Sequence, residues 1–136
     1  MPKSIIIKNN GGPEVLELQD VNLEEPGPTE IKIKNLAIGV NYIDTYHRSG
    51  LYKLPLPTGI GLEASAKIEK IGSEVKDFNV GDLVAYASMP IGAYAQERII
   101  PSKIAVKLPN YITPKIAATL MTKGLTTNYL ICKTYK

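Results

Sequence analysis

Cysteine, histidine and tryptophan are nearly absent from this sequence of 136 residues, which holds one cysteine, one histidine and no tryptophan. A single cysteine cannot close a disulfide within the chain, and low cysteine usage is typical of proteins in a reducing cytoplasm. Zinc sites need three or four cysteine, histidine or acidic ligands in a close group. Cys132 and His47 cannot supply such a set, so we expect no metal site.

Long apolar runs are missing as well. The N-terminal run of Ile5, Ile6 and Ile7 ends at Lys8 and is shorter than the core of a secretory signal peptide. No stretch approaches the ~18 apolar residues of a membrane span. The net charge of +3 is small and the basic residues form no stripe, which argues against a nucleic-acid partner. We therefore expect a cytoplasmic protein that binds neither membranes nor nucleic acids.

The remaining composition is that of an ordinary globular protein. Hydrophobic residues make up 44% of the chain and charged residues 21%, which excludes a disordered tail, a collagen-like fibre and a coiled coil. The length suits a single domain with a real hydrophobic core. It is too short to hold both a substrate-binding domain and a complete dinucleotide-binding fold.

The first two-thirds of the chain are predicted to form short strands separated by turns. The clearest signal lies in residues 30–38, where Ile31 and Ile33 alternate with Lys32 and Lys34, a pattern typical of a strand with one wet face. About seven short strands at close spacing predict a mainly β body that is closed or partly open. The other candidate strands are 5–8 and 15–21, as a hairpin, and then 64–71, 83–86, 93–100 and 104–108.

Two helices are predicted beside these strands. Residues 41–49 fit about two turns of helix ending before Gly50. Thr113 and Pro114 pair an N-cap hydroxyl with a proline at the first helical position, which predicts the start of a C-terminal helix. Gly124 is expected to bend this helix or divide it in two, and the apolar residues after Gly124 predict burial against another surface. We therefore separate a β domain at residues 1–112 from a helical segment at 113–136.

Short motifs follow one another along the chain in a specific order. They are NNGGPEVL at 9–16, GVNYIDTY at 39–46, RSGLY at 48–52, GLE at 61–63, VGDLV at 80–84, KGLT at 123–126 and KTY at 133–135. Each motif is weak alone. In this order they resemble the zinc-free quinone oxidoreductases of the medium-chain dehydrogenase/reductase superfamily, and the resemblance covers nearly the whole chain.

This resemblance implies a GroES-like, partly open β-barrel with C-terminal helices, the N-terminal domain of such enzymes. In that family NADPH lies between this domain and a following Rossmann domain, which also forms the homo-oligomer, and a hydride passes to a quinone. The sequence contains no glycine fingerprint of a Rossmann fold. We therefore expect a fragment or a truncated product that binds NADPH weakly and is inactive alone.

The resemblance also bears on metal use and on one amide. Zinc enzymes of the superfamily carry a cysteine near position 39 and a histidine at position 62, where this sequence has Gly39 and Leu62. Zinc-independent chemistry is therefore implied, with the substrate activated by positioning and hydrogen bonds.

Asn41 corresponds to the family's substrate-side amide, suited to donate to a quinone oxygen that gains negative charge. Its alternative role is an ordinary helix N-cap, and one residue can fill both roles.

Tyrosines complete the site that the resemblance implies. Tyr46 and Tyr52 match the aromatic walls of the quinone pocket, because flat side chains suit a flat acceptor. The alternative is ordinary packing, since the chain has eight tyrosines. The implied catalytic residues are thus Asn41, Tyr46 and Tyr52. The implied contacts to the nicotinamide half of the cofactor are Tyr42, Ile43, Asp44, Thr45 and Tyr46, with Asp44 a structural hydrogen-bond acceptor.

The C-terminal helix supplies further candidates. By resemblance it approaches the ribose and phosphates of the cofactor through Lys123, Thr126 and Tyr129. The alternative is a solvated helix surface. Glu63 is expected to be a buried structural acid beside the cleft, His47 an exposed or rim residue and Cys132 a core thiol.

Two other functions remain open from the sequence. An enoyl reductase of the same superfamily would share this domain and reduce an activated C=C bond in place of a quinone. A non-catalytic binding or assembly module is the second alternative, because the cofactor domain is missing and the terminal helix is apolar.

Overall fold

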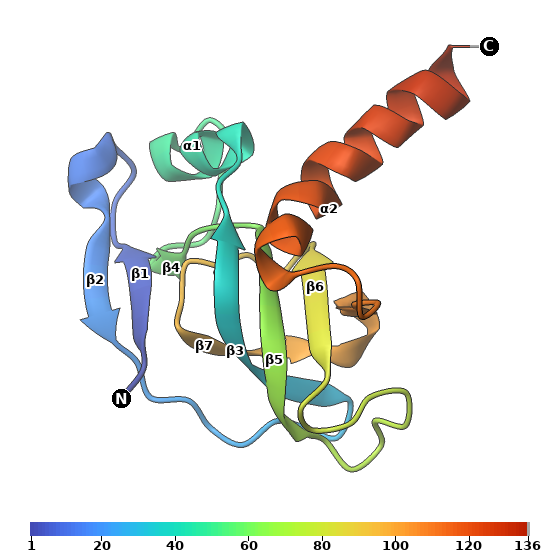
Figure 1. The fold of residues 1–136 in the computed structure, drawn as a ribbon. Coiled ribbons are helices and arrows are strands. Elements are labelled where there is room, and N and C mark those ends of the chain that lie inside the picture. Colours follow the sequence, from blue (N-terminus) through green and yellow to red (C-terminus); the bar gives the residue numbers. More distant parts are fainter. Residues whose placement is uncertain (136) are drawn as a thin grey trace.

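The computed structural model describes residues 1–135, which form two antiparallel sheets and two α-helices (Figure 1). One sheet has the strand order β7-β3-β5-β6-β8 and the other the order β2-β1-β4. The strands are β1 Lys3–Ile7, β2 Glu17–Asp20, β3 Glu30–Gly39, β4 Thr58–Gly59, β5 Glu63–Ile71, β6 Leu83–Ala87, β7 Glu97–Pro101 and β8 Val106–Lys107, and the helices are α1 Tyr42–Ser49 and α2 Pro114–Tyr129. Short 3-10 turns occupy Pro13–Val15 and Ser102–Ile104, and a π-helical turn follows α2 at Leu130–Thr134. The predicted partly open, mainly β architecture is confirmed.

The N-terminal hairpin forms as predicted, with β1 and β2 paired antiparallel from Lys3 opposite Asp20 to Ile6 opposite Glu17. The expected strand at 93–100 is shorter than predicted, because only Glu97–Pro101 pairs with β3. The Asn35 side chain bonds the carbonyls of Ala93 and Ala95 at 3.0 and 2.8 Å. The backbone of this segment also meets β1, because the Ile5 N–H donates to the Tyr94 carbonyl and the Gln96 N–H donates to the Lys3 carbonyl, both at 2.8 Å. The residues before β7 are therefore held by the Asn35 side chain together with a short antiparallel bridge to β1.

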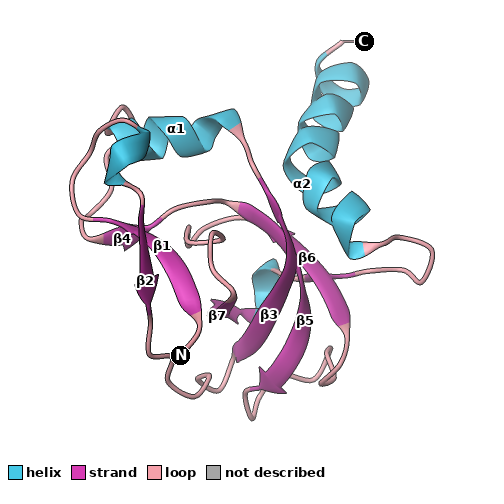
Figure 2. Cartoon of the chain, turned by 60° about the vertical axis from the view of Figure 1, so that its left-hand side comes forward, coloured by secondary structure: helices cyan, strands magenta, loops and turns pink. Residues whose placement is uncertain are grey.

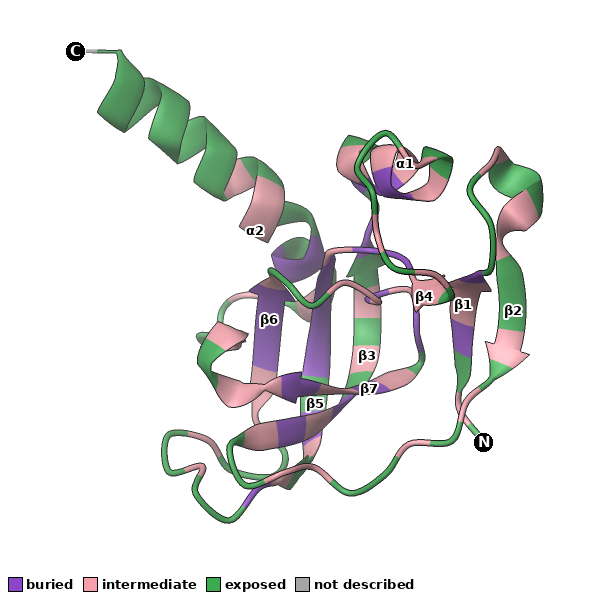
Figure 3. Ribbon diagram, turned by 180° about the vertical axis from the view of Figure 1, so that it is seen from behind, coloured by how far each residue is buried: buried purple, intermediate pink, exposed green. Residues whose placement is uncertain are grey.

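The core lies on the inner face of the larger sheet. Ile31 and Ile33 are fully buried, as the alternation along β3 predicts, and Ile68, Val84 and Ile100 pack with them. The first four residues of β5 are buried on both faces. The first turns of α2 pack against the start of β5 and the end of β6, where Figure 3 shows them, so this end of the sheet is covered on both faces. The small residues Ala117 and Ala118 make this contact close.

Both helices begin where the sequence predicts. Asn41 stands at the N-cap of α1, and Gly50 ends that helix with a φ of 82°, in the left-handed region that favours glycine. Thr113 caps α2 by accepting the backbone N–H of Ile116 at 3.3 Å. The prediction that Gly124 divides the helix is wrong, because α2 runs through it to Tyr129. A glycine inside a helix costs only ~1 kcal/mol, which good helix formers around it offset.

The outer half of α2 projects away from the sheets (Figures 1 and 2). Leu125, Tyr129 and Ile131 are each more than half exposed, so the predicted burial of this segment is not found within residues 1–135. Cys132 is likewise exposed, contrary to the expectation of a core thiol. Among the described residues, no helix is both long and apolar enough to cross a membrane.

Candidate functional site

The candidate site lies where β3 and β5 end beside α2. Gly39, the last residue of β3, pairs with Glu63, the first residue of β5. The backbone of α2 approaches so closely that a Cβ on Gly39 would lie 2.2 Å from the carbonyl oxygen of Ala118. Only glycine permits this approach. The chain then turns through Val40 and Asn41 into α1, so that α1 begins at the end of the sheet where α2 packs.

Three polar side chains form a connected network at this point. Asn41 Nδ2 donates to Glu63 Oε2 at 2.7 Å, and Lys123 Nζ donates to Asn41 Oδ1 at 3.0 Å. Lys123 Nζ also donates to the carbonyl of Val40 at 3.2 Å and lies 3.9 Å from Glu63 Oε2. Glu63 is fully buried and Asn41 is 7% exposed, whereas the Lys123 side chain is 55% exposed. The network therefore runs from the protein interior to an ammonium at the surface.

Hydrogen-bonding capacity shows which donors stay free. The Asn41 amide has two N–H donors, one of which is held by Glu63, and its oxygen is taken by Lys123. An ammonium has three donors, and Lys123 uses two of them on Asn41 and Val40. Lys123 thus keeps one charged, partly exposed donor, and it is better placed than Asn41 to meet an incoming oxygen.

Asp44 faces into the protein. Its Oδ2 accepts the backbone N–H of Asn41 at 2.9 Å and the phenol of Tyr94 at 2.8 Å, and the residue is 4% exposed. These bonds match a structural acceptor that fixes the start of α1. Burial, followed by the adjacent Asp44 carboxylate, raises the pKa of Tyr94, so the phenol is kept protonated and donating.

The tyrosines of α1 and of the loop after it gather into an aromatic row. The Tyr46 ring lies 5.3 Å from the Tyr42 ring and 5.3 Å from the Tyr52 ring, both in edge-to-face geometry. Tyr42 is 76% exposed and Tyr52 51% exposed. His47 lies 6.1 Å from Tyr52 and is buried, not at the rim as expected. The row therefore offers apolar ring surface to solvent, and it begins at Tyr42, the residue that follows Asn41 in the chain.

The remaining predicted residues lie around these two groups. Ile43 and Thr45 are half-buried on α1, and the Thr45 hydroxyl donates to the Tyr42 carbonyl at 2.7 Å. On α2, Thr126 and Tyr129 are exposed beyond Lys123, and the Thr126 hydroxyl donates to the Thr122 carbonyl at 2.7 Å. The structure thus brings Asn41 and Lys123 into contact, groups the tyrosines separately, and leaves Thr126 and Tyr129 on the projecting part of α2.

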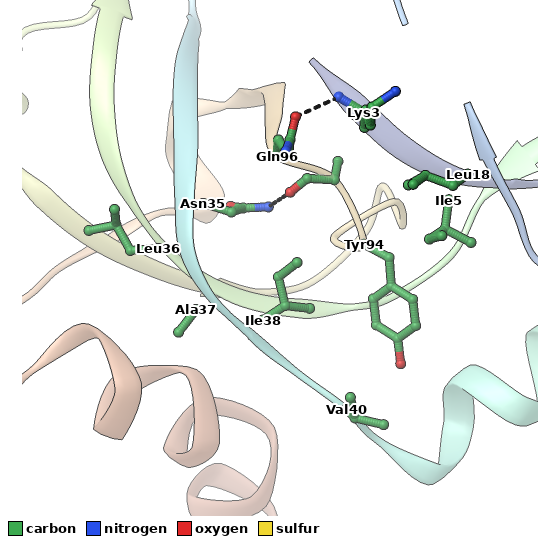
Figure 4. A pocket seen from close by; sticks show the side chains of 11 residues that line it. Lys3, Ile5, Leu18, Asn35, Leu36, Ala37, Ile38, Val40, Tyr94 and Gln96 are labelled. Carbon is green, nitrogen blue, oxygen red and sulfur yellow. Dashed lines mark hydrogen bonds between the residues drawn. The ribbon is translucent and has the colours of Figure 1, made fainter. Parts of the chain in front are cut away.

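A hollow of about 510 Å³ opens between the two sheets, apart from the network (Figure 4). Its lining comes from β1, β2, β3 and the segment before β7: Lys3, Ile5, Leu18, Asn35, Leu36, Ala37, Ile38, Val40, Tyr94, Ala95 and Gln96. It contains none of the residues predicted for catalysis or cofactor binding. Leu36 and Ile38 lie on the same face of β3 as Lys32 and Lys34, the face that the alternation predicts to be exposed to solvent. Apolar residues at these two positions are the signal in the sequence for this groove.

Acidic, cysteine and histidine side chains form no metal-binding cluster in the part of the chain that the structure describes. Among residues 1–135, no group of three or more of them is close enough to hold a metal ion. The buried acids of the site, Glu63 and Asp44, are instead engaged by amide, phenol and backbone donors.

Comparison with known proteins places this site in a family context. Residues 27–110 match the alcohol dehydrogenase GroES-like domain family. The chain is 50% identical over 137 residues to a quinone oxidoreductase of Pseudomonas aeruginosa, covering 100% of this chain and 42% of that protein. It is 39% identical over 143 residues to a 2-haloacrylate reductase of Burkholderia sp, covering 100% of this chain and 43% of that protein.

Solved structures agree with these sequence relatives. A quinone oxidoreductase of Pseudomonas syringae superposes with a TM-score of 0.96 at 48% identity, over 100% of this chain and 42% of that one. A quinone oxidoreductase of Escherichia coli complexed with NADPH superposes with a TM-score of 0.95 at 44% identity, over 98% of this chain and 41% of that one. The chain thus spans about two-fifths of the length of these relatives. It belongs to the alcohol dehydrogenase GroES-like domain family, and its resemblance to the N-terminal part of quinone oxidoreductases is confirmed.

Proposed function

We propose that this chain forms the substrate-side domain of an NADPH-dependent quinone oxidoreductase. The observation that carries the proposal is the network from buried Glu63 through Asn41 to the half-exposed Lys123 ammonium, with the aromatic row of Tyr42, Tyr46 and Tyr52 nearby. A charged donor next to exposed ring surfaces suits a flat acceptor whose oxygen gains negative charge.

The residues present fit a nicotinamide cofactor in their donor chemistry. Thr126 and Tyr129 carry exposed hydroxyls on α2, which match ribose hydroxyls or a carboxamide oxygen. Lys123 adds positive charge on the same helix, and its one free donor is left for the acceptor oxygen. When bound, reduced nicotinamide supplies a hydride. Asp44 contributes by holding the start of α1, since its side chain is turned inward.

The chain's own residues orient the acceptor and stabilise its charge. Tyr46 and Tyr52 flank the ring of a quinone, and their exposed edges exclude water from its faces. Lys123, with the second N–H of Asn41, donates to the quinone oxygen as charge develops there. The proton that completes the reduction comes from water at this open surface, because Asp44 is buried and already bonded on one oxygen by two donors.

Zinc-independent activation is part of this proposal, and the crowding at Gly39 supports it. A side chain at position 39 would collide with the backbone of α2, because a Cβ there lies 2.2 Å from the Ala118 oxygen. A cysteine ligand at this position would therefore require α2 to move. Hydrogen bonding from Lys123 and Asn41 takes the place of a Lewis acid.

A chimera tests the proposal directly. This chain replaces the matching N-terminal part of the Escherichia coli quinone oxidoreductase, with which it is 44% identical in the superposed region, and NADPH oxidation is followed with 1,4-benzoquinone. We expect turnover, and we expect Lys123→Ala to lower kcat/KM by about tenfold or more. Exposed Lys103→Ala is the matched control. A folded chimera with no turnover, or equal effects of the two variants, would contradict the proposal.

An activated C=C bond is the second candidate acceptor. It is favoured by the 39% identity to a 2-haloacrylate reductase, and a carbonyl or carboxylate oxygen conjugated to the double bond would use the same donor. The chimera assayed side by side with 1,4-benzoquinone and 2-chloroacrylate distinguishes the two. If kcat/KM is higher for 2-chloroacrylate than for 1,4-benzoquinone, the activated C=C bond replaces the quinone as the proposed acceptor.

A further inference from the structure

We infer that Glu63 is a positioning residue, which sets the orientation of the Asn41 amide and thereby the place of the Lys123 ammonium. Its importance for turnover rests on the function proposed above, whereas the positioning itself is a property of the fold. Glu63 touches neither substrate nor solvent, because it is fully buried. It acts through the two residues that reach the surface.

The direction of every hydrogen bond in the network follows from Glu63. A carboxylate only accepts hydrogen bonds, so the group of Asn41 that faces it must be the N–H₂ end. The Asn41 oxygen then points away from Glu63, to where Lys123 Nζ donates at 3.0 Å. A flipped amide would put Nδ2 against the ammonium, two donors face to face. The buried acid therefore decides which end of Asn41 meets Lys123.

Glu63 also holds the turn of α2 that carries Lys123. Its other oxygen, Oε1, accepts the backbone N–H of Thr122 at 2.9 Å. Thr122 and Lys123 are adjacent in the chain, so one carboxylate fixes both the backbone before the lysine and the amide that receives its ammonium. The ammonium lies 3.9 Å from Oε2, which offsets part of the cost of burying the acid's charge.

Replacing Glu63 by glutamine should break this pattern in either orientation. With the glutamine N–H₂ end toward Asn41, the asparagine must flip, and its own N–H₂ end then faces the ammonium. With that end toward Thr122, a donor faces the Thr122 N–H. The volume is unchanged in both cases, so the effect isolates the hydrogen-bond direction from packing.

Replacing Asn41 by aspartate as well should restore the pattern. In the double variant the glutamine oxygen accepts from Thr122, its N–H₂ end donates to the aspartate, and the aspartate accepts from Lys123. The total charge equals that of the original pair. Asn41→Asp alone instead places two carboxylates against each other, which is destabilising. Both single variants should therefore lower the stability of the folded chain, and the double variant should regain it.

The test is a double-mutant cycle on this 136-residue chain, followed by urea unfolding and by amide hydrogen exchange of Thr122. We expect each single variant to lower the folding equilibrium constant by about tenfold or more. The N41D/E63Q variant should regain most of that loss, with Thr122 exchange again slow. The control cycle combines N41D with Glu97→Gln, because Glu97 pairs with Lys32 near the start of β3, whereas Asn41 follows the end of that strand. That cycle should be additive.

Additive losses in the N41D/E63Q cycle would overturn the inference, as would an unchanged Thr122 exchange rate in both single variants. These readouts need neither NADPH nor a quinone. A chimera without turnover would therefore refute the proposed function and leave the positioning intact, whereas an additive cycle would refute the positioning and leave the function standing.

Discussion

The phenol of Tyr94 donates to Asp44 Oδ2 at 2.8 Å, and the same oxygen accepts the backbone N–H of Asn41 at 2.9 Å. One carboxylate oxygen thus ties the segment before β7 to the first residue of the turn into α1. Because α1 carries Tyr42 and Tyr46, this bond anchors the helix that supplies two of the three tyrosines of the aromatic row.

Tyr94→Phe should destabilise the protein. The substitution keeps the ring and removes one hydrogen bond to a buried carboxylate, a loss of about 1 to 3 kcal/mol. Urea unfolding at neutral pH measures it as a lower midpoint at an unchanged slope. Tyr111→Phe is the matched control, because Tyr111 is 83% exposed and its removal should be nearly neutral. Equal midpoints for Tyr94→Phe and the original chain would show that the bond is not stabilising.

The contribution of the same hydrogen bond to stability should depend on pH in the alkaline range. Burial and then Asp44 raise the pKa of Tyr94 in the folded protein, whereas an unfolded tyrosine ionises near pH ~10. Above that pH the unfolded chain loses the phenol proton before the folded chain does, so stability must fall as pH rises. The loss is absent below pH ~10, where both states keep the proton.

Urea unfolding midpoints measured from about pH 9 to about pH 11 check this dependence, because that range brackets the ordinary tyrosine pKa of about 10. Lysines titrate in the same range, so the informative quantity is the difference between the original chain and Tyr94→Phe. That difference should shrink as pH rises, because only the original chain loses the contribution of the phenol. A constant difference across the range would contradict the shifted pKa.

Two glycines near α2 should respond to alanine in opposite directions. A Cβ on Gly39 would lie 2.2 Å from the Ala118 carbonyl oxygen and 2.7 Å from Glu63 Oε2, so Gly39→Ala must push α2 away, at a cost of about 3 kcal/mol or more. A Cβ on Gly124 meets only the Leu120 side chain at 3.9 Å. Gly124→Ala should therefore stabilise α2 by about 0.5 to 1 kcal/mol. Thermal unfolding of both variants tests the pair, and a tolerated Gly39→Ala would refute the close approach.

Local pattern was enough to predict much of the fold. The alternation of Ile31 and Ile33 with lysines predicted β3 and its buried face, and Thr113 with Pro114 predicted the start of α2, because these signals depend on neighbours in the chain. The failures involve distant partners. The predicted strand at 93–100 is divided between partners, because its first residues bond β1 and the Asn35 side chain and only Glu97–Pro101 pairs with β3. The end of α2 is exposed within residues 1–135 although its composition predicted burial.

The candidate site was predictable as residues and not as a network. Resemblance pointed to Asn41 and Lys123, but their contact joins positions 82 residues apart, a separation that no periodicity reports. Glu63 was expected to be a buried structural acid, which its complete burial supports. Its hydrogen bonds to the Asn41 amide and the Thr122 backbone could not be predicted, because the orientation of an amide depends on which groups the folded chain places around it.

Ser65→Ala should loosen the anchor of α2. The Ser65 hydroxyl on β5 donates to the Pro114 carbonyl at 2.6 Å, and Ser65 is fully buried. Removing it leaves no new charge and only a small cavity, so we expect a loss of about 1 to 2 kcal/mol in urea unfolding. Amide exchange in the first turns of α2 should quicken more than exchange in β3, because the lost bond holds the helix against the sheet. Ser73→Ala, at an exposed turn position, is the matched control, and uniform acceleration across the chain would instead mean that α2 does not open separately from the sheet.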